Sequence, residues 1–406
     1  MKFIKSPIIP AIVFALALFT NCVNAQTARP EFEATTDPST WKGVALQLKF
    51  GAGTGITDKV LQQSDFDYAA SAGANVVRLV IHADPYAGRG NKPTSTFVDK
   101  GGNVIPAASS PGIADLKMAA AMAKKTGIKL IIDMHTAPHA TTGEIFNDQA
   151  YWDTMVSIWR EITASFKNNP NVIAFDLMNE PKILAWMRSQ GTNTEEIQKA
   201  MFARTWTPPK EWEGTPRDYN FEITKLIKAV RAIDPSRTVI VEGFGMLGNP
   251  SNFAWLKPIE GLDNVVYSAH IYEPARLVFI GMKHGNNKNA KGQKFVYPDD
   301  KSLIDHAFAP VIAFQHKYNV PIYIGEFGIS DGAIFDSNAA GQPYNGSCWM
   351  TTIVKMLDEN HFGWTYWDFW HKGMFPDKTD DPRYIVLSAA MKHLEIPDYC
   401  KVNTSR

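Results

Sequence analysis

Two glutamates of the chain, Glu180 and Glu326, stand where a carboxyl group could take part in catalysis. Glu180 follows the mostly apolar run 172–178, and Glu326 lies in a second such run, 320–328. Runs of this kind are typical of strands that are covered on both faces. Pro181 cannot donate to a sheet and disfavours a helical backbone at Glu180. We therefore expect Glu180 where a buried strand opens into a loop; the alternative is a charged strand end that only faces water.

Further polar residues end or interrupt the other apolar runs. They are Arg78, His82, Asp133, His135, Asn179, Glu242, His270 and Tyr272, with Lys372 after the last run. Burying a charged or polar group costs free energy unless the group is paired or functional. One such residue is usually a satisfied core contact, but their recurrence at the same end of most runs indicates a functional site.

A pair of carboxyl groups at one site suits the hydrolysis of glycosidic bonds. An enzyme that retains the anomeric configuration needs them about 5–5.5 Å apart. One group must hold a proton, which calls for a raised pKa, and the other must be ionised, which calls for hydrogen bonds and a nearby cation. Arg78 is the candidate cation, His135, His270 and Tyr272 are candidate donors, and Asn179 is suited to hold a sugar hydroxyl.

Eight strand-like runs, most of them separated by a helix-like segment, must position these residues. The runs are 44–50, 75–82, 128–135, 172–178, 237–244, 264–274, 320–328 and 362–370. The helix-like segments are one that ends near Gly73, then 113–127, 151–170, 221–235, 302–319, 347–360 and 385–394. Alternating buried strands and helices predict a parallel sheet, and eight units predict an α/β fold of the (β/α)8 TIM-barrel type. A doubly wound open sheet is the alternative, although no G-x-G-x-x-G or P-loop follows the first run.

Four connections that follow strand-like runs are longer than a simple loop. They are 83–112, 136–150, 182–220 and 275–301, and in a barrel all four would lie on its C-terminal face. The longest contains Trp186, Trp206 and Trp212. We expect this stretch to border a groove and to offer at least one indole for stacking on a sugar.

Composition and length predict one neutral globular domain. The chain has 406 residues and a formal net charge of zero, which gives no argument for binding nucleic acid or an anionic membrane. No linker-like stretch marks a second domain, so we expect a single domain over 41–396, preceded by an irregular leader, 26–40, and followed by a tail, 397–406. We expect the protein to be a monomer.

The N-terminal segment 1–25 has the pattern of a signal peptide. Lys2 and Lys5 precede the apolar run 8–19, which is too short to span a bilayer, and Ala25 ends a plausible cleavage site. We expect secretion to the extracellular space or periplasm, with a lipid anchor on Cys22 as the alternative. Cleavage would leave Cys348 and Cys400, which could pair in an oxidising compartment or remain free thiols.

Four short motifs occur in order along the chain, each in or after a different strand-like run. They are Asn179-Glu180-Pro181, Ser268-Ala269-His270-Ile271-Tyr272-Glu273-Pro274, Gly325-Glu326-Phe327-Gly328 and Trp364-Thr365-Tyr366-Trp367. With these motifs the chain resembles glycoside hydrolase family 5, the cellulase-type barrels, over about 41–396. The resemblance implies that Glu180 is the general acid/base and Glu326 the nucleophile. It further implies that substrate-binding positions are Arg78, His135, Asn179, His270, Tyr272 and Trp367. No metal or organic cofactor is implied.

The sequence leaves alternative roles for several of these residues. Trp364 competes with Trp367 as the sugar platform; we prefer Trp367 because Lys372 follows it by five residues, a spacing seen in some endoglucanases of the family. Glu242 is either a substrate contact or part of a structural ion pair. His82 and Asp133 are interpreted as structural, with Asp133 orienting a neighbouring His or Arg.

The backbone at the first glutamate poses a further question. Asn179 and Glu180 are adjacent, so a regular strand would point them to opposite faces. Both reach the site only if the strand end is irregular, for example through a bulge.

The preferred function is a secreted, retaining endo-β-glycanase that cuts β-1,4-glucan. Alternatives within the fold are a β-mannanase and a mixed-linkage or branched-glucan hydrolase. A carbohydrate-binding barrel without catalysis is a different class, which the presence of both glutamates disfavours. A metal-dependent hydrolase would use His82, His135 and His270, but no tight ligand motif such as H-E-x-x-H is present.

Overall fold

The computed structural model describes residues 35–48, 61–83, 97–99, 101–138, 143–245, 248–281, 294–367 and 379–401. Within these ranges eight parallel strands form a closed barrel in chain order, and β8 pairs with β1. The strands are β1 (Lys42–Gln47), β2 (Val76–His82), β3 (Lys129–Thr136), β4 (Val172–Asp176), β5 (Thr238–Glu242), β6 (Val265–Ile271), β7 (Ile322–Phe327) and β8 (Gly363–Tyr366). The predicted (β/α)8 barrel is confirmed, and the open sheet is excluded because β1 and β8 close the ring.

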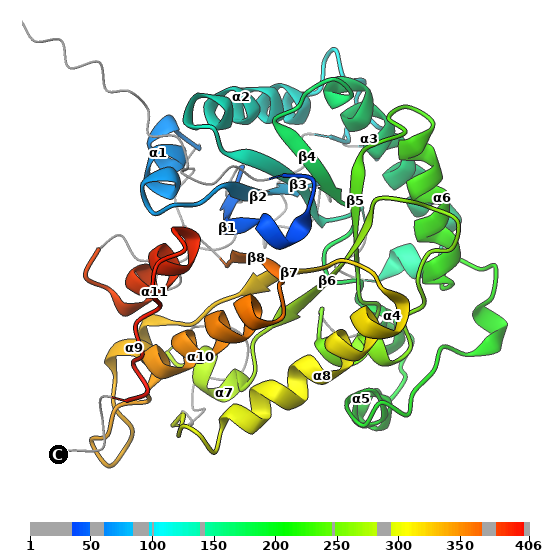
Figure 1. Ribbon diagram of the computed structural model, residues 1–406. Coiled ribbons are helices and arrows are strands. Elements are labelled where there is room, and N and C mark those ends of the chain that lie inside the picture. Colours follow the sequence, from blue (N-terminus) through cyan, green and yellow to red (C-terminus); the bar gives the residue numbers. More distant parts are fainter. Residues whose placement is uncertain are drawn as a thin grey trace, which may run out of the picture.

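Helices surround the strands on the outer side of the barrel (Figure 1). They are α1 (Gln63–Ser71), α2 (Pro111–Thr126), α3 (Gln149–Phe166), α6 (Tyr219–Arg231), α8 (Lys301–Tyr318), α10 (Gly346–Glu359) and, after β8, α11 (Pro382–Met391). Between β5 and β6 the described residues hold only a 3-10 turn, η4 (Pro250–Ala254), in place of a barrel helix. One side of the barrel is therefore covered by less helix than the others.

Local signals in the sequence account for the bounds of these helices. In α2, the Ser110 hydroxyl accepts from the backbone N–H of Ile113, Pro111 occupies the first turn, and Gly127 ends the helix with φ of 82°. A hydroxyl cap, an N-terminal proline and a left-handed glycine are typical start and stop signals. Asp148 and Asp218 cap α3 and α6 in the same way.

The long connections contain short helices that the periodicity did not predict. They are α4 (Ile183–Ser189), α5 (Glu195–Phe202) and η3 (Lys210–Trp212) in 182–220, η2 (Glu144–Phe146) in 136–150, and α7 (Ala275–Val278) in 275–301; a further short helix, α9 (Asp331–Phe335), lies outside them, between β7 and α10. Among the described residues no helix has the length and apolar character needed to cross a bilayer. The predicted signal peptide, with Cys22, lies outside the described residues.

The inside of the barrel is built in layers. A buried apolar layer fills the end at which the strands begin; its members are Trp41, Val76, Ile131, Ala174, Ile240, Val266 and Tyr323. The turn η1 (Pro38–Thr40) precedes Trp41 and packs near β7 and β8. The last residues of the expected irregular leader are therefore an ordered part of the barrel.

A charged layer lies above this apolar one. Arg78, Asp133, Asp176 and Glu242 each lie two residues beyond an apolar member of the lower layer on the same strand, and all four are fully buried. Residues two apart on a strand share a face, so these side chains also point into the barrel. The alternation along four strands thus places a layer of charged side chains inside the barrel, below its C-terminal mouth.

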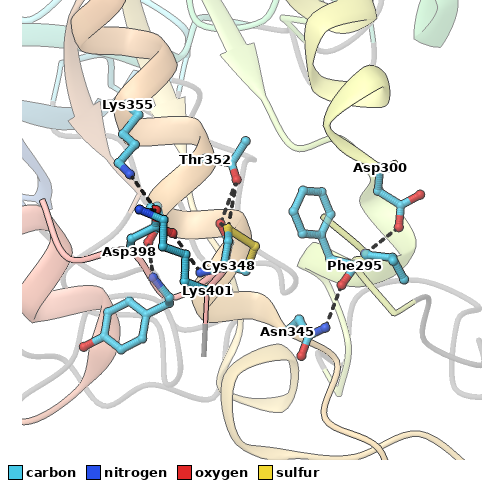
Figure 2. Close-up of a disulfide and its surroundings, with 12 residues drawn as sticks. Phe295, Asp300, Asn345, Cys348, Thr352, Lys355, Asp398 and Lys401 are labelled. Carbon is cyan, nitrogen blue, oxygen red and sulfur yellow. Dashed lines mark hydrogen bonds and ion pairs between the residues drawn. A yellow bond between two sulfur atoms is a disulfide. The ribbon is translucent and has the colours of Figure 1, made fainter. Parts of the chain in front are cut away.

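The predicted disulfide is present and ties the C-terminal tail to α10. Cys348 and Cys400 are bridged, with Cα atoms 4.6 Å apart. Figure 2 shows Asp398 of the tail between Lys355 and Lys401, with Nζ–Oδ2 distances of 3.3 and 3.2 Å. The tail described up to Lys401 is thus docked on the barrel. A free pair of thiols, the alternative, is excluded.

Replacing Cys400 by Ser should lower the free energy of unfolding by about 2–4 kcal/mol, because the bridge closes a long loop in the unfolded chain. The measurement is urea unfolding with and without dithiothreitol. Reductant should bring the wild-type protein to the stability of Cys400→Ser and leave the variant unchanged. A wild-type transition insensitive to reductant, with two titratable thiols, would contradict the bridge.

Candidate active site

Arg78 is the centre of the polar layer. Its guanidinium donates from Nε to Asp176 at 2.9 Å, from Nη1 to Glu326 at 2.7 Å, and from Nη2 to Asn179 at 2.9 Å and Glu242 at 3.0 Å. Its side chain has no exposed surface. One arginine on β2 therefore aligns polar side chains from the ends of β4, β5 and β7.

Too many carboxyl groups surround Arg78 for all of them to be ionised. Burial raises the pKa of Asp133 to about 7, against the opposing charge of Arg78. Burial likewise raises the pKa of Asp176 well above its usual range, with Arg78 again opposing. Burial thus favours the protonated form of both aspartic acids, and the charge of Arg78 opposes it.

Glu326 on β7 has a donor for each carboxylate oxygen. Oε1 accepts from Arg78, and Oε2 accepts from the Tyr272 hydroxyl at 2.9 Å. The side chain is 5% exposed. Both oxygens are thus held in place near the mouth of the barrel.

Glu180 lies beyond the end of β4, which stops at Asp176, and it adopts a left-handed backbone with φ of 45°. Its N–H donates to Glu242 Oε2 at 2.7 Å, and the N–H of Asn179 donates to Met134 O at 3.1 Å. The chain has left the strand here, which is why Asn179 and Glu180 can both reach the site. The irregular strand end that was expected is therefore present, as a left-handed residue after the strand.

One oxygen of Glu180 and one of Glu326 lie within 4.8 Å of each other, together with a ring nitrogen of His270. This is the one close group of three potential metal ligands in the part of the chain that the structure describes. The three histidines of the metal alternative do not form such a group: it contains His270 but neither His82 nor His135, which pack edge-on against each other with ring centroids 5.8 Å apart.

His270 sits between the two glutamates and Glu242. Its Nδ1 is 3.0 Å from Glu180 Oε1 and its Nε2 is 3.1 Å from Glu242 Oε1. Burial works against its charged form, but the charges of Glu242 and Glu326 and the bond to Glu180 raise the pKa of His270 well above its usual range. These neighbours favour the charged form of His270, whose Nδ1–H is placed to donate to Glu180 Oε1.

The expectation of a raised pKa at Glu180 is wrong for the free protein. Burial favours the protonated form, yet the hydrogen bond from His270 and the charge of Lys182 lower the pKa of Glu180 to about 2. Lys182 Nζ lies 3.5 Å from Glu180 Oε2. Sequence reasoning missed Lys182, although a cation two residues after the glutamate was a readable signal.

Glu242, which the sequence left open, is a fully buried member of the ion network. It accepts from Arg78 and from the N–H of Glu180 and faces His270. Burial acts to raise the pKa of Glu242, but the charge and hydrogen bond of His270, with Arg78, lower it. A carboxylate enclosed in this way holds Glu180 and His270 and is not a surface for substrate.

His135 and Trp367 form one wall of the site. Their rings are stacked, with centroids 4.8 Å apart and planes 8° apart, and both side chains keep part of their surface exposed. His135 Nδ1 is 2.9 Å from Asp133 Oδ2, and burial lowers the pKa of His135 to about 4, so the ring is neutral and donates to Asp133. Asp133 thus orients both His135 and Arg78, as predicted.

The competing tryptophan, Trp364, is fully buried against Phe327, which leaves Trp367 as the accessible one of the two candidates. His82 is a partly buried neighbour of His135, and its Nδ1 lies 3.2 Å from Thr136 Oγ1. Burial lowers the pKa of His82 to about 3, and repulsion from His135, when that ring is protonated, adds to the effect. The predicted Lys372 lies outside the described residues.

The three tryptophans of 182–220 form a cluster of their own. Trp186 and Trp206 pack edge-on or tilted against Trp212, at 6.1 and 6.2 Å between centroids. Arg217 covers one face of Trp186 at 4.5 Å. Trp186 and Trp206 are partly exposed, so the loop is not a closed core, and stacking of a sugar on it stays a prediction.

Comparison with known proteins decides the family. The model of the cellulase family, glycosyl hydrolase family 5, matches residues 32–373. The chain belongs to glycosyl hydrolase family 5. The resemblance inferred from the strand-end motifs is thereby confirmed, and the chain is a glycoside hydrolase.

Individual relatives are distant. An endoglucanase of Paenibacillus polymyxa is 24% identical over 253 residues, which cover 60% of this chain but only 54% of that protein. Endoglucanase C of Acetivibrio thermocellus is 21% identical over 348 residues, 77% of this chain and 84% of the relative. Thermotoga maritima Cel5A, solved with cellobiose, has a TM-score of 0.62 at 20% identity and covers 87% of this chain and 99% of its own. A second structure of Cel5A, with mannotriose, has a TM-score of 0.61 at 19% identity, covering 88% and 98%.

Two glycines confine His270. A Cβ at Gly248 would lie 2.8 Å from His270 Cγ and Nδ1, and a Cβ at Gly325 would lie 3.1 Å from its Nε2. The N–H of His270 also donates to Gly248 O at 2.9 Å. Gly248 has φ of +65°, a backbone conformation that glycine adopts readily. Its lack of a side chain therefore allows this conformation and also leaves room for the ring of His270.

Gly248→Ala should push His270 away from Glu180 and lower kcat by about 10–100-fold, because small displacements of catalytic groups are costly. Gly261→Ala is the matched control: Gly261 has φ of +71°, and a Cβ added there would meet no atom of the described residues within 4 Å. In both variants the free energy of unfolding should fall by about 1–2 kcal/mol, because alanine disfavours the left-handed backbone conformation that glycine adopts. Aryl-glycoside kinetics and thermal melts give the comparison, and equal kcat in the two variants would refute the positioning role.

Proposed function

We propose that the protein is a secreted endo-β-glycanase that hydrolyses β-1,4-linked glucan with retention of configuration. The observation that carries this proposal is the close approach of Glu180 and Glu326, whose oxygens lie within 4.8 Å at the mouth of the barrel. Retaining pairs are separated by about 5–5.5 Å and inverting pairs by about 6.5–9.5 Å. Secretion rests on the N-terminal sequence pattern alone.

In the first step Glu326 attacks the anomeric carbon and forms a covalent glycosyl–enzyme, while the bond to the leaving oxygen breaks. Arg78 and Tyr272 hold the attacking carboxylate in place. Glu180 delivers a proton to the leaving oxygen. His270 Nδ1 lies 3.0 Å from Glu180 Oε1 and is placed to supply that proton through one hydrogen bond.

In the second step Glu180 takes a proton from water, which attacks the anomeric carbon and releases Glu326. The proton returns along the same hydrogen bond to His270, so the charges of the site are restored. Two inversions at one carbon give net retention. Lys182 and the imidazolium of His270 favour the ionised form of Glu180 that this step requires.

The substrate wall is assigned to His135 and Trp367. Trp367 has one face against His135, and the part of its indole that stays exposed offers a platform for the apolar side of a pyranose. Asn179, held by Arg78 at 2.9 Å, is placed to contact a sugar hydroxyl beside the glutamates.

A β-mannanase is the second candidate. It is favoured by the pair of solved Thermotoga maritima Cel5A structures, one with cellobiose and one with mannotriose, since both share this fold. Reducing-sugar release from carboxymethylcellulose, lichenan, xyloglucan, mannan and xylan separates the candidates. We expect the highest rate on β-1,4-glucan; a higher rate on mannan would replace the glucanase by the mannanase.

The two glutamates should differ in their mutant behaviour. Glu180→Ala should lose on the order of 10²–10⁴-fold on glycans but keep activity on aryl glycosides with good leaving groups, which need little protonation. Azide should rescue it and yield a β-glycosyl azide. Glu326→Ala should lose turnover on every natural glycan and accept only an α-glycosyl fluoride.

Glu196→Ala is a matched control, because Glu196 is an exposed glutamate on α5. It should behave as wild type in every assay. Proton NMR of the first-formed product gives the stereochemistry. An inverted product, or an α-glycosyl azide from Glu180→Ala, would exclude the proposed roles.

A further inference from the structure

A cavity of about 420 Å³ opens on the outer side of the barrel, where η4 replaces a helix between β5 and β6. It is lined by residues that precede and begin α6, by Phe244 after β5, by the segment that follows η4, and by Tyr318, the last residue of α8. None of the lining residues belongs to the catalytic group, whose side chains point into the barrel. The cavity is therefore separate from the site of the two glutamates.

The wall of the cavity is aromatic. Trp212, Tyr219, Phe244 and Trp255 line it, and Tyr219 and Phe244 are stacked with ring planes 7° apart. Trp255 is partly exposed, and its Nε1–H donates to Phe244 O at 3.0 Å, which fixes the indole. Trp212, Tyr219 and Phe244 are buried and support it from behind, so Trp255 is the aromatic of this wall that offers a fixed apolar surface to a pyranose ring.

The polar lining is balanced in charge. It contains Arg217 and Lys257, and against them Glu213 and Asp218. Asp218 is already engaged, since it accepts from the N–H groups of Gly214 and Phe221. Arg217 Nε is buried and has no hydrogen-bond partner among the described residues. Donors and acceptors without a net charge suit a neutral ligand rich in hydroxyl groups better than an anion or a cation.

We propose that this cavity is a second saccharide-binding site, which holds a short stretch of the neutral glycan chain away from the glutamates. Its volume is in the range of small-molecule sites. The segment between α5 and α6 that lines it, green in Figure 1, belongs to the same long insertion that follows Glu180. The choice of ligand rests on the proposed function, but the existence of binding does not require hydrolysis.

The test measures binding in a Glu326→Gln background, so that the probe is not consumed. Native gels containing hydroxyethylcellulose and titrations with cellotetraose compare Trp255→Ala and the double variant Glu213→Ala/Lys257→Ala with the parent. We expect each to weaken retardation in the gel at least about fivefold. Phe221→Ala, which removes an exposed aromatic outside the cavity lining, is the matched control and should leave retardation unchanged.

Different results would overturn the second saccharide-binding site and the proposed hydrolytic function. In the hydrolytically competent background, Trp255→Ala and the double variant should keep kcat/KM on a small aryl cellobioside within about twofold. Unchanged retardation of a folded Trp255→Ala, or of the double variant if Trp255→Ala melts early, would overturn the second site. If the wild-type protein hydrolyses no glycan, the proposed function is overturned. Retardation in the gel then decides by itself whether the cavity binds a saccharide.

Discussion

The burial of Arg78 among acidic side chains is the constraint on which the site depends. A fully buried guanidinium is tolerated only if its donors are satisfied, and here Asp176, Glu326, Asn179 and Glu242 satisfy them. Those partners come from strands far apart in the sequence. Arg78 can therefore be paired in this way only when the barrel is closed in the correct register, and its bond to Glu326 fixes the orientation of that side chain.

His270 extends this network to the second glutamate. Glu242 holds the histidine on one side and the backbone of Glu180 on the other, while Gly248 and Gly325 leave just enough space for the ring. The result is a glutamate that is ionised in the free protein but lies next to a proton donor. Acid and base behaviour of one carboxyl group can then arise from a single short proton transfer and do not require a permanently raised pKa.

Much of this could be predicted from the sequence, because the relevant information is periodic or adjacent in the chain. The eight runs predict the barrel, and the strand-end position of Glu180, Glu326, Arg78 and His270 predicts that they meet. What could not be predicted depends on distances through space. The low pKa of Glu180 comes from Lys182 and His270 together, and the covering of Trp186 by Arg217 comes from the fold of an irregular loop. The short helices α4 and α5 lack a long apolar period, so they too were invisible.

The apolar layer around Trp41 and Tyr323 has a consequence for how the charges above it respond to the medium. It seals the barrel from below, so that mobile ions can approach the network of Arg78 only through the mouth. Exposed ion pairs are screened within about 8–10 Å at physiological ionic strength, whereas buried pairs are screened much less. The alignment of Glu326 and His270 is thus insulated from changes in salt that would weaken pairs on the surface, and a bound sugar that fills the mouth would complete the insulation.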